Sequence, residues 1–246
     1  MKNPSFTIGW RRIAIACLLA LACLTGVTKA EVVYENTLGA TNYFLFTREY
    51  GDDINLAGTS RYVNQISILY GAVLPAGTQS TAQYRIRFYA NNGQLSNPSI
   101  ATSQRPGTLL WTSELLPVVA QPPNATLATI SVPNILVPDR FTWTVEFLNI
   151  PQGSQNGAGL VVANPVSIGA LLPGRFSPVV GSYGDFWVRQ VAGNDDSWAL
   201  NTIGNSPVNF YIQVNAVPEP AVVALGALGA TALLWQARRR RNALTR

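Results

Sequence analysis

Aromatic and acidic side chains gather in the C-terminal third of the chain in a pattern typical of sugar binding. Tyr183, Asp185 and Trp187 stand at alternate positions, and Trp198 follows a short acidic turn. Flat aromatic rings stack on the apolar faces of sugars, while carboxylates accept hydrogen bonds from sugar hydroxyls. These four residues therefore predict a glycan-binding site. The alternative is that Trp187 and Trp198 belong to the hydrophobic core.

Two oxygen-rich segments could hold calcium. Asp52 and Asp53 stand in a Gly-Asp-Asp-Ile-Asn run, and Asp195 and Asp196 stand in a Gly-Asn-Asp-Asp-Ser run. Calcium takes about six to eight oxygen ligands, which flexible loops supply as carboxylates and carbonyls. Neither run has the spacing of an EF-hand, and a solvated turn would use the same residues. Calcium at these aspartates is therefore the one cofactor hypothesis, and no other cofactor is expected.

Residues 31–216 contain no histidine and no cysteine. This excludes Ser-His-Asp and Cys-His nucleophiles, histidine general bases, and zinc sites built on those residues. A glycosidase-type pair of carboxyl groups is the catalytic arrangement that the composition still allows. Glu114, Glu146 and Asp185 could contribute to it, but any domain with eleven acidic residues offers such pairs. We therefore predict that the chain is not an enzyme.

The N-terminal segment, 1–30, has the three parts of a secretory signal peptide. The start is basic, and an apolar run then extends from Ile13 to Leu24. That run is shorter than the roughly 17–25 residues of a membrane-spanning helix. Small residues at Thr28 and Ala30 predict cleavage after Ala30. The alternatives are an anchor that is never cleaved and a lipoprotein signal that ends at Cys23.

The C-terminal segment, 217–246, has its own order of features. Pro218, Glu219 and Pro220 stand near its start, and an apolar run then extends from Ala221 to Trp235. A basic cluster follows, formed by Arg238, Arg239, Arg240 and Arg241. Such a cluster after an apolar helix holds that end in the cytoplasm. The run is short and interrupted by glycine, which suits a segment that is removed after export.

These features, in this order, resemble the PEP-CTERM sorting signal of Gram-negative bacteria. With the signal peptide, the resemblance divides the chain into a leader (1–30), an exported domain (31–216) and a sorting tail (217–246). It implies processing by an exosortase, transient contact with the inner membrane, and a host that makes exopolysaccharide. It does not define the activity of the domain that the tail carries.

The positive charge of the chain belongs to its two ends. The whole chain has a net charge of +5, whereas residues 31–216 hold eight arginines, no lysine and eleven acidic residues, a net charge of −3. The basic balance is therefore no indication of a nucleic-acid partner. Because both cysteines lie in the leader, the exported domain must rely on its core rather than on disulfides.

The exported domain has the residue pattern of an all-β protein. Gln83–Tyr89 and Phe141–Phe147 alternate between aromatic or aliphatic residues and polar residues, among them Arg85 and Arg87. No segment has helical periodicity. We predict an antiparallel β-sandwich, jelly-roll-like, flanked by an N-terminal signal helix and a C-terminal hydrophobic helix. Further strands are expected at 65–70, 109–113, 127–132, 160–163, 186–191 and 210–214, and near 40–46.

A fainter resemblance extends into the domain. Residues 85–91, 106–110 and 141–145 are similar to segments of a group of anchored surface proteins, which supports the β-sandwich and implies no catalytic residue. The sequence thus predicts an exported surface or extracellular-matrix protein that associates with exopolysaccharide in biofilm or floc. The alternatives are a structural or adhesive module with protein partners and, less favoured, a glycan-active enzyme.

Overall fold

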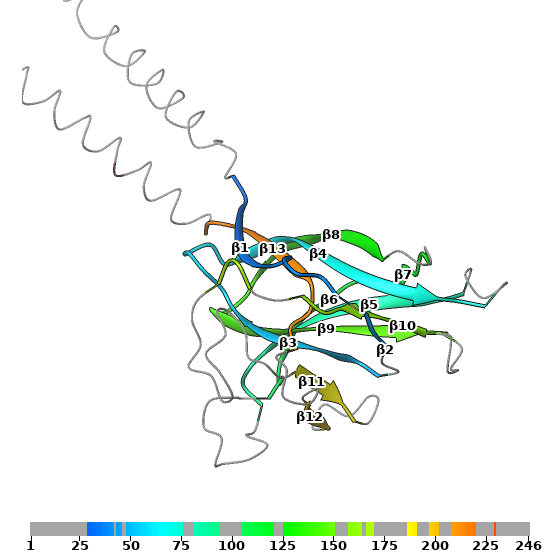
Figure 1. Ribbon diagram of the computed structural model, residues 1–246. Coiled ribbons are helices and arrows are strands. Elements are labelled where there is room, and N and C mark those ends of the chain that lie inside the picture. The colour runs from blue at the N-terminus through cyan, green and yellow to red at the C-terminus, as the bar shows by residue number, and fades with distance from the viewer. Residues whose placement is uncertain are drawn as a thin grey trace, which may run out of the picture. The chain divides into compact units, whose positions relative to one another are not determined.

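The computed structural model describes most of residues 31–216. The described residues are 29–41, 43–45, 48–75, 81–93, 105–120, 125–150, 157–163, 166–169, 186–190, 197–201, 208–219 and 229. The strands lie in one compact unit, Ala30–Val217. Within the described ranges, two antiparallel sheets pack against each other (Figure 1). The predicted all-β sandwich is confirmed, whereas the predicted flanking helices lie, apart from Gly229, outside these ranges.

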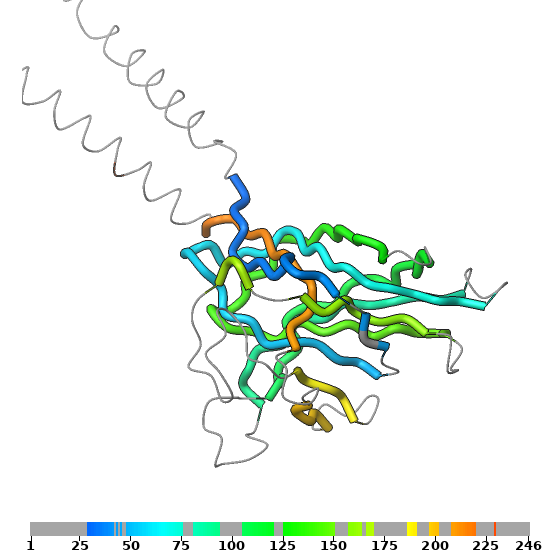
Figure 2. Tube along the Cα trace, viewed as in Figure 1, coloured from blue at the N-terminus to red at the C-terminus, as the bar shows by residue number. Residues whose placement is uncertain are grey.

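The first sheet is organised around its longest strand, β4. In the described part of the chain it consists of β1 (Glu31–Asn36), β2 (Tyr43–Leu45), β4 (Tyr62–Val73), β8 (Thr126–Leu136), β10 (Gly157–Val161) and β13 (Ile212–Val217). β8 pairs with one edge of β4, while β13 and β10 occupy successive parts of the other edge. β1 pairs with β13, so the first and last strands of the domain lie side by side (Figure 2).

The second sheet has the order β12-β11-β3-β9-β5-β6, and β7 also pairs with β5. Its strands, as far as the chain is described, are β3 (Tyr50–Asn55), β5 (Gln83–Ala90), β6 (Leu109–Thr112), β7 (Leu116–Pro117), β9 (Arg140–Leu148), β11 (Phe186–Arg189) and β12 (Trp198–Asn201). The predicted alternation of β9 is confirmed in direction, because Phe141, Trp143 and Val145 belong to the main core, whereas Thr142 and Thr144, which are just as buried, lie on the other face of the sheet.

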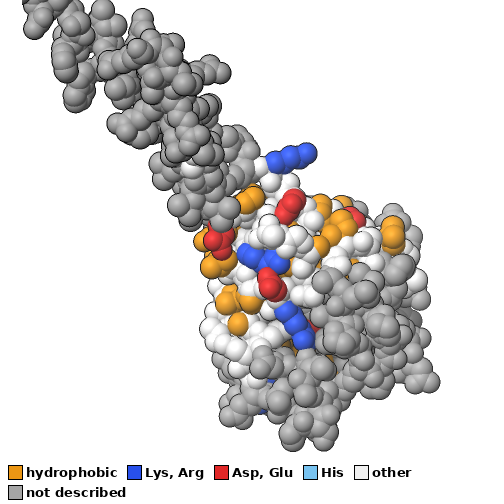
Figure 3. All heavy atoms as spheres, turned by 90° about the vertical axis from the view of Figure 1, so that its left-hand side faces the viewer, with side chains coloured by type: hydrophobic (Ala, Val, Ile, Leu, Met, Phe, Trp, Pro, Cys, Tyr) orange, Lys and Arg blue, Asp and Glu red, His pale blue; other side chains and the backbone are white. Residues whose placement is uncertain are grey.

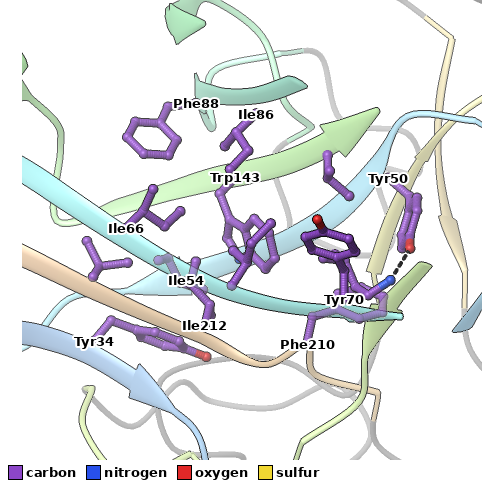
Figure 4. Packing of buried hydrophobic residues seen from close by; sticks show 14 of the residues in the cluster. Tyr34, Tyr50, Ile54, Ile66, Tyr70, Ile86, Phe88, Trp143, Phe210 and Ile212 are labelled. Atoms are coloured by element: carbon purple, nitrogen blue, oxygen red, sulfur yellow. Dashed lines mark hydrogen bonds between the residues drawn. The ribbon is translucent and has the colours of Figure 1, made fainter. Parts of the chain in front are cut away.

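Aromatic side chains from both sheets fill the space between them (Figure 4). Phe210, which precedes β13, packs edge-on against Tyr50 of β3 at 5.3 Å between ring centroids and against Trp143 of β9 at 6.4 Å. The Tyr50 hydroxyl also accepts a hydrogen bond of 2.7 Å from the backbone N–H of Leu160 in β10. One tyrosine thus joins the sheets by packing and by a hydrogen bond, and burial raises its pKa.

A β-bulge keeps both ends of β4 in the core. Val63 and Ile66 are both fully buried although they are three positions apart, a spacing that points side chains to opposite faces of a regular strand. Val63 and Gln65 lie opposite the consecutive residues Ala216 and Asn215 of β13, so Asn64 is an extra residue on β4 that restores the inward direction. This explains why the alternation in the sequence predicted this strand only from residue 65, although the strand begins at Tyr62.

The other expected strands are confirmed in place, since each predicted range overlaps an observed strand. Four observed strands lie outside those ranges: β1, β3, β7 and β12. The most important of them is β3, because residues 50–55 were expected to form an oxygen-rich loop. That expectation is wrong: Tyr50–Asn55 pairs along its whole length with β9.

Replacing Tyr50 by phenylalanine is expected to destabilise the domain by about 1–3 kcal/mol, because it leaves the buried Leu160 N–H without its acceptor. Equilibrium denaturation measures the loss. The matched control is Tyr62→Phe, which removes the hydroxyl of a half-buried tyrosine and should change the free energy of unfolding by less than about 0.5 kcal/mol. Equal effects of the two substitutions would contradict the structural role of the Tyr50 hydroxyl.

Candidate functional site

The residues predicted for export and sorting are described only in part. Ala30 is exposed and directly precedes β1, while Pro218 and the exposed Glu219 directly follow β13. In this described part, no helix is both long and apolar enough to cross a membrane. Outside it lie Pro220 and the basic cluster Arg238, Arg239, Arg240 and Arg241. Pro218, the first residue of the predicted sorting motif, therefore follows the last strand directly, with no residue between them.

Trp187 and Trp198 lie on the outer face of the second sheet, yet both are buried, with exposed fractions of 1% and 4%. They pack with Leu200 and with Tyr89 of β5, whose ring centroid lies 5.4 Å from that of Trp198. The two indoles therefore offer no exposed face on which a sugar could stack. The alternative interpretation as core residues holds for both, in a small cluster separate from the main core. Tyr183 and Asp185 lie outside the described residues.

Asp52 and Asp53 cannot serve one calcium ion, because neighbouring residues of a strand point to opposite faces. Asp52 lies opposite Trp143 in the register and is buried on the core face. Asp53 is buried on the outer face, where it forms an ion pair with Arg140. Burial raises the pKa of Asp53, and the Arg140 guanidinium opposes that rise. The predicted calcium loop at this position is therefore corrected to a strand.

The second predicted calcium segment, at Asp195 and Asp196, lies outside the described residues. Elsewhere, across the ranges given above, no three histidine, cysteine or acidic side chains gather closely enough to hold a metal ion. The calcium hypothesis thus stays with Asp195 and Asp196.

A buried carboxylate that sequence reasoning missed, Glu49, organises the outer face of the second sheet. Its side chain is 1% exposed and forms ion pairs with Arg87 of β5 at 2.7 Å and with Arg189 of β11 at 2.8 Å. Its other oxygen accepts hydrogen bonds from the hydroxyls of Tyr89 at 2.9 Å and Thr144 of β9 at 2.7 Å. Glu49 immediately precedes β3, so one carboxylate connects four strands.

Glu146 of β9 extends this network. One of its oxygens accepts hydrogen bonds from Arg85 at 3.0 Å and from Arg87 at 2.8 Å. Burial alone would raise the pKa of Glu146, but the hydrogen bonds and charges of these two arginines outweigh it and hold the pKa below its usual value. We call the set of Glu49, Arg85, Arg87, Tyr89, Thr144, Glu146 and Arg189 the Glu49 cluster.

The Glu49 cluster is suited to joining strands rather than to catalysis. A retaining or inverting glycosidase needs one protonated carboxyl group with a raised pKa and open space between the two carboxyl groups. Here Glu49 and Glu146 share the guanidinium of Arg87, which stands between them and stabilises both charges. Burial opposes the charge of Arg87, but Glu49 and Glu146 keep its pKa above the usual value.

No family model, no curated protein and no solved structure matches this chain.

Replacing Glu49 by glutamine should destabilise the domain strongly, by about 3–5 kcal/mol, because it removes the buried carboxylate that pairs with Arg189 and leaves Arg87 with the charge of Glu146 alone. Chemical denaturation of the purified full chain measures the loss. Glu114→Gln is the matched control, since the Glu114 carboxylate is exposed and in no described ion pair. A Glu49→Gln variant as stable as the control would show that the cluster does not hold the sheet together.

The pH dependence of stability provides a separate test. Because Glu146 has a lowered pKa in the folded protein, it stabilises the fold above its usual value of 4.5, and this contribution is lost as the pH falls through the folded-state pKa. The free energy of unfolding of the wild type should therefore fall more steeply below about pH 4.5 than that of Glu146→Gln. Parallel pH dependences of the free energy of unfolding for the two proteins would contradict the stabilising role of the ionised Glu146.

Proposed function

We propose that this chain is an exported surface or extracellular-matrix protein that is processed by an exosortase and associates with exopolysaccharide. The observation that carries the proposal is the order of features in the segment 217–246: Pro218-Glu219-Pro220, an apolar run and four arginines. Together with the signal peptide ahead of Glu31, this order suits a protein that leaves the cytoplasm and pauses in the inner membrane. The mature protein would then reside at the cell surface or in the matrix.

The exported domain would act as a binding or structural module of jelly-roll-like type and not as an enzyme. Two findings support this role. The domain lacks histidine and cysteine, and the carboxylates of Glu49 and Glu146 are both neutralised by arginine. Acidic and basic side chains are intermixed on the face shown in Figure 3, which argues against nucleic acid as a partner.

An adhesive module with protein partners is the second candidate, and β8 favours it. This strand of 11 residues stands at the edge of the first sheet as far as the chain is described, and it carries the exposed Leu127 and Leu136. Long edge strands can pair with an incoming strand of another chain. A polysaccharide partner remains our first proposal because the sorting tail implies a polysaccharide-producing host.

The fate of the tail tests the proposal. The protein is isolated from the wild-type host and from a host without exosortase, and its intact mass and cell fraction are determined. We expect loss of the tail near Pro218 in the wild type alone, with the shortened protein at the cell surface or in the matrix. An intact tail that stays in the inner membrane of both hosts would exclude sorting and leave a membrane-anchored sandwich.

Substitution of the motif gives the matched control for that experiment. Glu219→Ala changes an exposed residue after the last strand and should block processing without changing the stability of the domain.

A further inference from the structure

The outer face of the first sheet carries two adjacent rows of uncharged polar side chains, contributed by β13, β4 and β8. The register places Asn215, Gln65 and Ser131 in one row and Gln213, Ser67 and Thr129 in the next. Residues that oppose each other in antiparallel strands share a face, and the buried neighbours Ile66 and Val214 point to the core. We call these six residues the polar rows.

The polar rows form a regular grid. Neighbouring strands lie about 4.8 Å apart, and alternate residues along a strand lie about 7 Å apart. Hydrogen bonds fix the side chains within each row: Asn215 Nδ2 donates to Gln65 Oε1 at 2.8 Å, and the hydroxyls of Ser67 and Thr129 are 2.9 Å apart. The amide groups are therefore held in place before any ligand arrives, which lowers the entropy lost on binding.

Much of the hydrogen-bonding capacity of these side chains is left over. An Asn or Gln amide offers two donors and one carbonyl oxygen. Among the described residues, hydrogen bonds engage Gln65 through Oε1, Asn215 through Nδ2 and Gln213 through Nε2. Gln65 Nε2, Asn215 Oδ1 and Gln213 Oε1 thus remain for an external partner. All three amides are half-buried, while Thr129 and Ser131 are exposed.

Apolar and aromatic side chains flank the polar rows on both sides. Towards one end of β4, Tyr62 lies opposite the exposed Leu136, and towards the other end Leu69 lies opposite the exposed Leu127. Beyond Leu69, the ring of Tyr43 covers Gly71, where a Cβ atom would collide with it. Amide groups between apolar and aromatic side chains match a sugar chain, which presents hydroxyls at its edges and C–H groups on its faces.

The charge on the outer face of the first sheet favours an uncharged polysaccharide as the ligand. The one described charge beside the polar rows is Glu35 of β1, whose carboxylate accepts hydrogen bonds from Gln213 at 3.0 Å and from Ser167 at 2.9 Å. On the outer face of the second sheet, Glu49 and Glu146 hold Arg85, Arg87 and Arg189, and Asp53 holds Arg140. A uronate- or sulfate-bearing polysaccharide would meet a negative charge here and, among the residues that the structure describes, no cation beside the polar rows, so it is disfavoured.

We infer that the polar rows are a binding surface for a neutral polysaccharide, contacted along β4 between Tyr62 and Tyr43. This inference rests on the proposed association with exopolysaccharide, and it specifies the surface and the class of polymer. It also replaces the predicted site at Trp187 and Trp198, whose rings are buried.

Affinity electrophoresis of the full chain in mild detergent tests the inference. Native gels contain either the neutral or the acidic fraction of the host's exopolysaccharide, separated by anion exchange. We expect the neutral fraction to retard the wild type, and the Gln65→Val, Gln213→Val double variant to bind about tenfold more weakly because it loses two hydrogen-bonding amides. Valine suits a strand, so the variant should unfold at nearly the wild-type temperature.

Gln83→Val is the matched control, because Gln83 is a half-buried glutamine on β5 of the other sheet, and it should bind like the wild type. Thr129→Val, on the edge strand, provides a second variant in the polar rows should the double variant fail to fold; it should weaken binding by about threefold. Wild-type binding to the acidic fraction alone, or undiminished binding by the folded variants, would overturn this surface and leave the proposed function standing. Binding to neither fraction would overturn both.

Discussion

The second sheet depends on one buried carboxylate. Glu49 lies just before β3 and contacts side chains from β5, β9 and β11, so it fixes four strands on a face that the main core does not reach. A buried carboxylate is costly unless its charge and lone pairs are satisfied, and here two guanidinium groups and two hydroxyls satisfy them. The domain has no disulfide, and this network joins its strands in addition to the apolar core.

This network also decides which surface remains for function. Arg85, Arg87 and Arg189 form ion pairs within this network. Their positive charges are therefore not available to bind an acidic polymer on the second sheet. The same face buries Trp187 and Trp198. The outer face of the first sheet differs, because its amides and hydroxyls contact one another at the surface and keep unused donors and acceptors. We therefore propose that the outer face of the first sheet is the one that binds, while the network on the second sheet is structural.

The sequence predicted the strands whose two faces differ in polarity. Phe141–Phe147 alternates because its inner face is apolar and its outer face carries Thr142, Thr144 and Glu146. β3 was missed because it holds a glycine and two aspartates, residue types that are depleted in strands and enriched in turns. Its place in the sheet comes from pairing with β9 and from the ion pair between Asp53 and Arg140, which are contacts between distant parts of the chain.

The sequence predicted the candidate functional sites less well than it predicted the strands. Trp187 and Trp198 stand near acidic residues in the sequence, but their burial depends on Tyr89, which is far away in the sequence. Arg85 and Arg87 on one strand face were a signal for the Glu49 cluster, because two adjacent arginines on a sheet need carboxylates nearby. The carboxylates, however, lie far away in the sequence. Glu146 is 59 residues from Arg87, and Glu49 is 140 residues from Arg189, so no local sequence pattern reveals these pairs.

We propose that this β-sandwich protein is exported and that polysaccharide retains it outside the cell. Quantifying the mature protein in the matrix and in the culture medium, for a wild-type host and for a host unable to make exopolysaccharide, tests it most directly. The account predicts that the protein stays in the matrix of the wild type and is released into the medium when the polymer is missing. Equal retention in both hosts would contradict the account and favour protein partners.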